Sequence, residues 1–143
     1  MEKVKEKSEV VIIGGVAAGP KTAAVLSRRI KDASITLFEK GNQISYGSCG
    51  MPYFASGDIN SFAELTQTSY GIPRDSEFFE KSKGFDVKIN HEVIKIDREN
   101  KSVTVKKTDS GANVNVFSNG RGGSLWRVAY RANFHKAITE FRR

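Results

Sequence analysis

Apolar and polar positions near the N-terminus predict a strand, a helix and a second strand. Residues 10–13 (Val-Val-Ile-Ile) form a continuous apolar run before glycine, which is typical of a parallel strand buried on both faces. A glycine-rich turn follows, and Pro20 suits the first turn of a helix that is expected to end near Ile30. Residues 35–39 predict the second strand. This segment therefore predicts one βαβ unit, whose crossover is expected to be right-handed.

The middle of the chain predicts two more helices and a polar connection. A short helix is expected after Cys49 and ends near Gly57, whereas residues 58–72 are polar and loop-like. Pro73 is expected to open a second helix that Gly84 closes, because glycine readily adopts the left-handed backbone that ends many helices.

Four short β-prone segments follow, each bounded by turn residues. They are residues 85–89, 93–97, 102–107 and 114–117. Because the connections between them are short, the pattern predicts a small antiparallel β meander added to the βαβ unit. The predicted fold class is therefore α/β.

Composition and charge narrow the possible partners. The 143 residues suffice for one domain, and no apolar run has the length of a membrane span, so no membrane partner is expected. Six basic residues and one acidic residue fall in 118–143, so this segment carries +5 of the net charge of +7. Residues 1–117 are nearly balanced and offer no phosphate-tracking face, so no nucleic-acid partner is expected.

The glycine-rich turn has the features of a pyrophosphate cradle. Gly14 permits the turn, Gly15 lets backbone approach phosphates, and Gly19 permits close packing of helix and strand. The helix N-terminus adds unpaired N–H groups and a partial positive charge. Glu39 ends the second strand, where its carboxylate can accept hydrogen bonds from a ribose diol. Val16 stands at the position of the second glycine in the usual dinucleotide-binding fingerprint. The alternative interpretation is an ordinary glycine-rich turn between a strand and a helix.

Cys49 is the one cysteine of the chain, so it can pair only with another molecule, a cofactor or a substrate. A lone cysteine is also consistent with a reducing, cytoplasmic location. The alternative interpretation is a small buried hydrophobic residue. The two histidines, His91 and His135, are too few and too scattered for a metal site.

These motifs resemble the N-terminal FAD-binding segment of the pyridine nucleotide–disulfide oxidoreductases. The resemblance is to the single-cysteine branch, which contains coenzyme A-disulfide reductase, NADH oxidase, NADH peroxidase and the persulfide reductases. It is carried by the turn at 14–19, the Phe-Glu-Lys strand end at 38–40, and residues 44–53 around Cys49. Residues 91–97 also resemble the family's strand beside adenine. The implied fold is a Rossmann-like FAD/NAD(P)-binding unit, truncated relative to the family.

The resemblance implies roles for individual residues. Cys49 is the redox nucleophile facing the flavin, and its position before a short helix agrees because a helix N-terminus favours thiolate. The implied FAD-binding residues are Gly14, Gly15, Val16, Ala17, Ala18, Gly19, Glu39, Lys40, Ser48 and Val93. Arg28 and Ser45 match positions that hold coenzyme A in the coenzyme A-disulfide reductases. A solvated helix residue and a loop hydroxyl are the alternatives for these two.

The resemblance also implies a function. NAD(P)H reduces FAD, and electrons pass to Cys49 held as a mixed disulfide, persulfide or sulfenate, with a small-molecule disulfide, persulfide or peroxide as substrate. Full-length members are homodimers. A catalytically inactive FAD- or nucleotide-binding remnant without turnover is the alternative, and a binding module acting through the basic segment is a third hypothesis.

The family's NAD(P)H-binding and dimerisation domains, and a strand ending in Ala-Thr-Gly, are not found in the sequence. We therefore expect a partial FAD-binding domain over 1–117 and a basic tail over 118–143. A one-nucleotide shift of residues 123–130 can encode Glu-Ala-Tyr-Gly-Glu-Leu-Leu-Ile, which resembles the family's next strand. Out-of-frame translation is therefore a hypothesis for the tail, and the coding DNA tests it.

Overall fold

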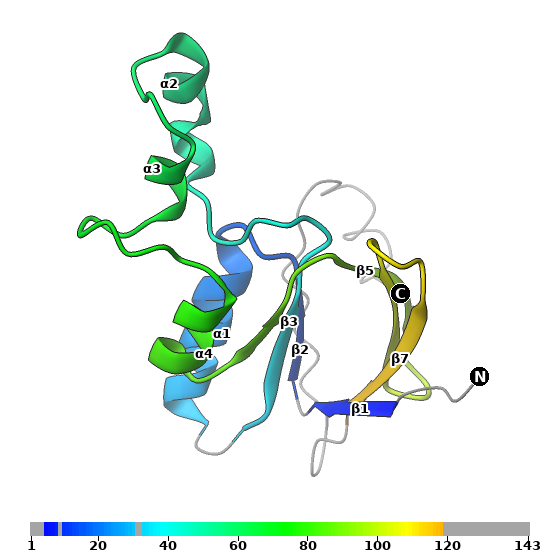
Figure 1. Cartoon of the computed structure of the whole chain (residues 1–143). Coiled ribbons are helices and arrows are strands. Elements are labelled where there is room, and N and C mark those ends of the chain that lie inside the picture. The colour runs from blue at the N-terminus through cyan, green and yellow to red at the C-terminus, as the bar shows by residue number, and fades with distance from the viewer. Residues whose placement is uncertain (1–4, 9, 31–32, 119–143) are drawn as a thin grey trace, which may run out of the picture.

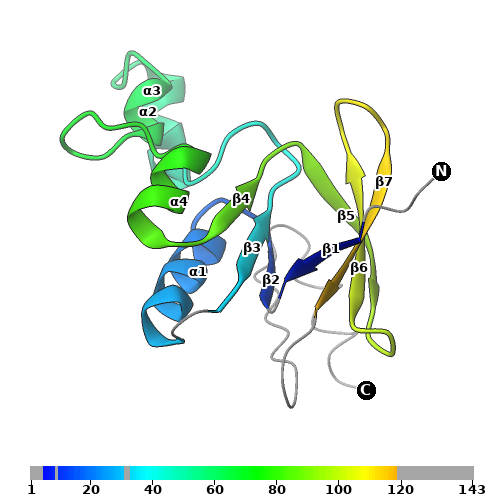
Figure 2. The same ribbon diagram turned by 60° about the horizontal axis from the view of Figure 1, so that its bottom comes forward.

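The computed structural model describes residues 5–8, 10–30 and 33–118. Their helices and strands form three layers. A parallel sheet lies between a pair of helices on one face and a second, larger sheet on the other (Figure 1). The same sandwich is visible from another direction, in which the helices and the second sheet still flank the parallel strands (Figure 2). Residues 119–143, which belong to the predicted basic tail, lie outside the described residues.

The parallel sheet consists of β2 (Val10–Ile13), β3 (Ile35–Phe38) and β4 (Asp86–Lys88), in that order. Helices α1 (Ala18–Arg29) and α4 (Ser76–Lys83) connect the strands and cover one face. The predicted βαβ unit is thus confirmed. The buried cluster on the helix side comprises Val10, Ile12, Ala23, Ala24, Ile35, Leu37, Ile44, Phe79 and Phe85.

The prediction that residues 85–89 belong to the antiparallel meander is wrong. β4 pairs in parallel with β3, with Leu37 opposite Val87. The reason is the connection: α4 lies between these two strands and packs on the helix side of the sheet through Phe79. A helical crossover returns the chain in the same direction, so β4 extends the parallel sheet.

The second sheet has the order β1-β7-β6-β5. Its antiparallel part, β5 (His91–Asp97), β6 (Ser102–Lys107) and β7 (Asn113–Ser118), confirms the predicted meander over its last three segments. The sequence did not predict β1 (Lys5–Ser8), which pairs in parallel with β7. Alternate residues of the parallel sheet, Val11 and Phe38, pack against Val103, Val105 and Val116 of the second sheet.

Between β3 and α4 the chain makes an excursion that extends away from both sheets (Figure 1). It contains the 3₁₀ turn η1 (Ser48–Gly50), α2 (Met51–Ser56) and α3 (Ala63–Thr66). Gly57 ends α2 with a φ of 87°, which confirms the predicted stop. The excursion has a small aromatic cluster, in which the Phe62 ring lies 6.2 Å from Tyr46 and 5.9 Å from Phe54.

Two boundaries differ from the predicted ones. Residues 58–72 are not entirely loop, because they contain α3. The helix predicted from Pro73 begins instead after Asp75, whose carboxylate accepts a hydrogen bond from the backbone N–H of Phe78 at 2.8 Å. This cap satisfies an N–H group that otherwise lacks an intrahelical partner. Gly84 ends the helix as predicted, with a φ of 71°.

No helix in the described part of the chain is long and apolar enough to cross a membrane.

Candidate functional site

The turn between β2 and α1 is built so that glycine is required at two positions. Gly14 has a φ of 99°, and its N–H donates to the carbonyl of Phe38 at 2.8 Å. A Cβ atom on Gly19 would lie 1.8 Å from the carbonyl oxygen of Gly14. Because that oxygen belongs to the backbone, a side chain at position 19 cannot be accommodated without moving the turn.

The N-terminus of α1 suits an anion. Its cap residue, Ala17, makes no side-chain capping hydrogen bond, and the first turn contains no acidic residue. Pro20 is buried in this turn. The backbone N–H groups and the helix dipole are therefore not neutralised by the helix itself, which fits the pyrophosphate of a dinucleotide.

Glu39 lies directly after β3, and its carboxylate holds two backbone N–H groups. Oε2 accepts from Gly15 at 2.6 Å and Oε1 accepts from Gly41 at 2.9 Å. A Cβ atom on Gly15 would lie 3.0 Å from the Cβ of Glu39 and 3.1 Å from Cγ1 of Ile44, so Gly15 also permits close packing here. Each carboxylate oxygen has a second lone pair, which leaves Glu39 able to accept from ribose hydroxyls.

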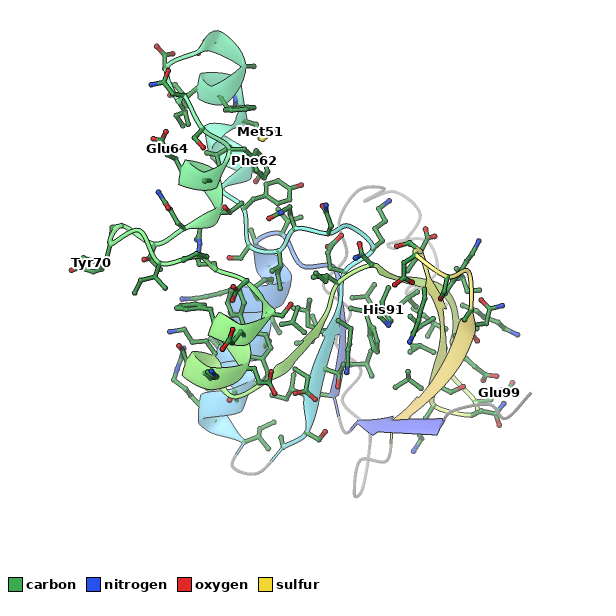
Figure 3. All side chains as sticks on the ribbon, viewed as in Figure 1. Met51, Phe62, Glu64, Tyr70, His91 and Glu99 are labelled. Atoms are coloured by element: carbon green, nitrogen blue, oxygen red, sulfur yellow. The ribbon has the colours of Figure 1, made fainter. Side chains whose placement is uncertain are left out.

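The start of β5 is hydrogen-bonded to the segment around Glu39. The backbone N–H of His91 donates to the carbonyl of Glu39 at 2.9 Å, and the ring Nδ1 lies 2.6 Å from the carbonyl oxygen of Ile89. Figure 3 shows His91 between the parallel sheet and the second sheet. Val93, two residues further along β5, is partly buried against the second core. His91 thus anchors the strand that carries the predicted adenine contact. The sequence motifs alone did not indicate this position of His91.

The cysteine lies at the surface, so the interpretation of Cys49 as a buried hydrophobic residue is wrong. It is a free, exposed thiol in η1, directly before α2. The loop that carries it is attached to the nucleotide turn, because the N–H of Ser45 donates to the carbonyl of Gly15 at 2.6 Å. Ser45 has a φ of 54°, which is uncommon for a residue with a side chain. Ser48 and Lys40 are exposed on the same stretch.

The two residues predicted to hold coenzyme A are not neighbours. Ser45 is bound at the N-terminal side of α1, whereas Arg28 is exposed in the last turn of that helix. Ten residues separate Arg28 from the helix start at Ala18, a rise of about 15 Å. A ligand that touches both residues must therefore be extended.

Four basic residues, which sequence reasoning did not group together, lie in the last turns of α1 and α4. The hydroxyl of Ser27 donates to the carbonyls of Lys83 at 2.7 Å and Gly84 at 3.2 Å, so the last turns of α1 and α4 adjoin. These turns carry Arg28, Arg29, Lys81 and Lys83. The hydrogen bond from Lys81 to Glu77, together with the charge of that carboxylate, raises the pKa of the Lys81 ammonium.

No group of three or more His, Cys, Asp or Glu side chains in the described ranges can hold a metal ion.

A parallel strand–glycine turn–helix unit with a glutamate at the next strand end defines a Rossmann-like dinucleotide-binding domain. The sequence profile described as pyridine nucleotide-disulphide oxidoreductase matches residues 8–121. The chain therefore belongs to the pyridine nucleotide-disulphide oxidoreductase family, whose members use FAD and NAD(P)H.

Curated relatives and solved structures agree with this assignment. The chain is 34% identical over 97 residues to a coenzyme A disulfide reductase of Staphylococcus haemolyticus, covering 68% of this chain and 21% of that protein. It is 35% identical over 97 residues to an NAD(P)H sulfur oxidoreductase (CoA-dependent) of Pyrococcus abyssi, covering 68% of this chain and 20% of that protein. The structure of an NAD-dependent persulfide reductase from A. fulgidus matches with a TM-score of 0.71 and 39% identity, over 76% of this chain and 20% of that one. The chain thus spans about a fifth of the length of these relatives.

Proposed function

We propose that this chain is the FAD-binding portion of an NAD(P)H-dependent flavoprotein reductase that uses Cys49 as its redox cysteine. The observation that carries the proposal is the hydrogen bond from Ser45 to Gly15, because it fixes the cysteine loop on the nucleotide turn. An exposed thiol attached in this way is open both to a bound cofactor and to a substrate.

The residues of the turn fit FAD. Residues 14–19 would hold the pyrophosphate at the uncapped start of α1, and the Glu39 carboxylate, which already accepts from Gly15, would also accept from the adenosine ribose. Val93 is proposed to contact adenine, with Lys40 and Ser48 on the flavin side. FAD, when bound, supplies the two electrons that NAD(P)H delivers. The NAD(P)H site itself is proposed to belong to the full-length protein.

Cys49 is proposed to perform the sulfur chemistry. Its thiolate attacks one sulfur of a small-molecule disulfide, forming a mixed disulfide on Cys49 and expelling the other half as a thiolate. The mixed disulfide needs two electrons to return the Cys49 thiolate and release a second product thiolate, and reduced FAD would supply them. Persulfide and peroxide are the other proposed oxidants, because the same thiolate attacks either. Ser45 and Arg28 are proposed to hold an extended substrate such as coenzyme A disulfide.

The test separates binding from turnover. The purified chain is expected to bind FAD weakly but saturably, which quenching of flavin fluorescence measures, and to show no NAD(P)H oxidation. Incubation with coenzyme A disulfide is expected to add one coenzyme A to Cys49 by intact-mass analysis, and Cys49→Ser removes that adduct. Absence of any saturable FAD binding contradicts the nucleotide site. Robust NADH consumption with coenzyme A disulfide contradicts the assignment of NAD(P)H binding to other parts of the protein.

A catalytically inactive nucleotide-binding remnant is the second candidate. FAD binding without any reaction of Cys49 with coenzyme A disulfide, persulfide or peroxide supports this candidate. In that case, a full-length relative in which this segment replaces its own N-terminal segment is also expected to show no NAD(P)H oxidation.

We also propose residues 1–117 as the nucleotide-binding unit and 118–143 as a separate basic tail that arises from out-of-frame translation. The coding DNA tests this hypothesis. If the shifted reading frame of this stretch does not encode the family's next strand, the hypothesis is refuted. Nucleic acid is not proposed as a partner, and removal of 118–143 is expected to leave nucleic-acid affinity unchanged. A cytoplasmic location and a homodimeric full-length protein complete the proposal.

A further inference from the structure

The carbonyl oxygen of Leu65, in α3, is shared by two segments of the excursion. It accepts a hydrogen bond from the backbone N–H of Gly47 at 2.7 Å and another from Nη2 of Arg74 at 2.9 Å. A carbonyl oxygen has two lone pairs, so both are used. Gly47 is the cap residue of η1, the turn that contains Cys49.

The side chain of Leu65 packs against the same turn. Only 5% of Leu65 is exposed, although it belongs to an excursion that extends from the body of the protein. A Cβ atom on Gly50 would lie 2.5 Å from Cδ2 of Leu65, so the turn packs directly on this side chain. Leu65 therefore contacts the residues on both sides of Ser48 and Cys49.

Arg74 is held in place by its own backbone. Its N–H donates to the carbonyl of Thr66 at 2.8 Å, and Gln67 pairs with Pro73 in an antiparallel bridge. Yet Nε of Arg74 is buried without a hydrogen-bond partner among the described residues. A buried unpaired donor destabilises a fold, so the stability of the excursion alone does not explain this arginine.

We propose that Arg74 and Leu65 are positioning residues for Cys49. Arg74 orients the Leu65 carbonyl, that carbonyl holds Gly47, and the Leu65 side chain holds Gly50, so the cysteine turn keeps one geometry. The proposal rests on the proposed function of Cys49. It adds a second attachment to the cysteine loop, because the hydrogen bond from Ser45 to Gly15 fixes only its beginning.

The test compares Arg74→Met with Arg74→Lys in the full chain. Met keeps the apolar stem but donates no hydrogen bond, whereas Lys restores one donor. Arg98→Met, in the exposed turn after β5, is the matched control. One readout is hydrogen exchange of the Gly47 amide, and the other is the pH–rate profile of Cys49 with an aromatic disulfide reagent.

Arg74→Met is expected to accelerate Gly47 exchange about tenfold and to displace the pH–rate profile, while amides of β2 and β3 keep their protection. Arg74→Lys is expected to restore both readouts, and Arg98→Met to change neither. An unchanged Gly47 amide and profile, or equal acceleration throughout β2 and β3, overturns the proposal. If Arg74→Met does not fold, Gly50→Ala disturbs the same turn through Leu65 and is expected to displace the profile, and no displacement overturns the proposal.

These outcomes are distinguishable from failure of the proposed function. Lack of any reaction of Cys49 with coenzyme A disulfide, persulfide or peroxide in the unmodified chain contradicts the reductase proposal, yet Gly47 exchange still reports whether Arg74 fixes the turn.

Discussion

The backbone N–H of Ser45 donates to the backbone carbonyl of Gly15 at 2.6 Å. The two residues are far apart in the sequence, and each belongs to a different part of the candidate site. Gly15 lies in the nucleotide turn, whereas Ser45 begins the loop that leads to Cys49. Because the bond is entirely between backbone atoms, it depends on the conformation of residue 45 rather than on its side chain.

Ser45→Pro is therefore expected to be much more harmful than Ser45→Ala. Proline has no N–H and cannot adopt a φ of 54°, so the bond to Gly15 is lost and unfolding becomes easier by more than about 1 kcal/mol. Alanine removes only the hydroxyl. Urea unfolding and flavin titration measure both effects. Equal behaviour of the two variants contradicts a role for the backbone bond, while a selective loss of coenzyme A adduct in Ser45→Ala identifies a role for the hydroxyl.

Gly19→Ala is expected to destabilise the domain by about 3 kcal/mol and to abolish FAD binding, because the new Cβ meets the Gly14 carbonyl at 1.8 Å. Gly41→Ala is the matched control, since its nearest contact would be 3.4 Å from Oε1 of Glu39. Thermal unfolding and flavin-fluorescence titration provide the readouts. A Gly19→Ala chain as stable as Gly41→Ala contradicts the packing of α1 on the turn.

Glu39→Gln tests the carboxylate that holds Gly15 and Gly41. The carbonyl oxygen of glutamine still accepts a hydrogen bond, but its NH2 group only donates, so one of the two backbone N–H groups loses its acceptor. The free energy of unfolding is expected to fall by about 1–2 kcal/mol, a modest loss because the site is only partly buried. FAD binding is expected to weaken as well. Glu92→Gln, exposed on β5, is the control. Unchanged FAD affinity in Glu39→Gln argues against ribose recognition by Glu39.

Asp97 gives a pH dependence of known sign. The side-chain amide and the backbone N–H of Asn100 both donate to its carboxylate and lower its pKa below 3.8. A lowered folded pKa means that this stabilisation is present above pH 3.8 and is lost as the pH falls through the folded value. Thermal unfolding between about pH 2 and 5 is expected to depend less on pH in Asp97→Asn than in the unmodified chain. The carboxyl titration by NMR measures the pKa directly, and an unshifted value contradicts the turn geometry.

Much of the fold follows from local pattern. The buried run at 10–13, the glycine turn and the acid after β3 predicted the βαβ unit, and Gly57 and Gly84 marked helix ends that the structure confirms. These features are local because backbone sterics and hydrogen bonding act over a few residues. The start of α4 was missed by a few residues, since Asp75 competes with Pro73 as a helix start and only the capping bond decides.

Local sequence pattern is enough to predict the strand–turn–helix unit, its need for glycine, and one cysteine beyond it. Three further features appear only in the folded chain: β4 joins the parallel sheet, β1 pairs with β7, and the cysteine loop is attached to Gly15 and Leu65. The physical reason is that periodicity fixes which residues form a strand or helix, whereas a strand's partner and a carbonyl's donor depend on packing between segments distant in the sequence.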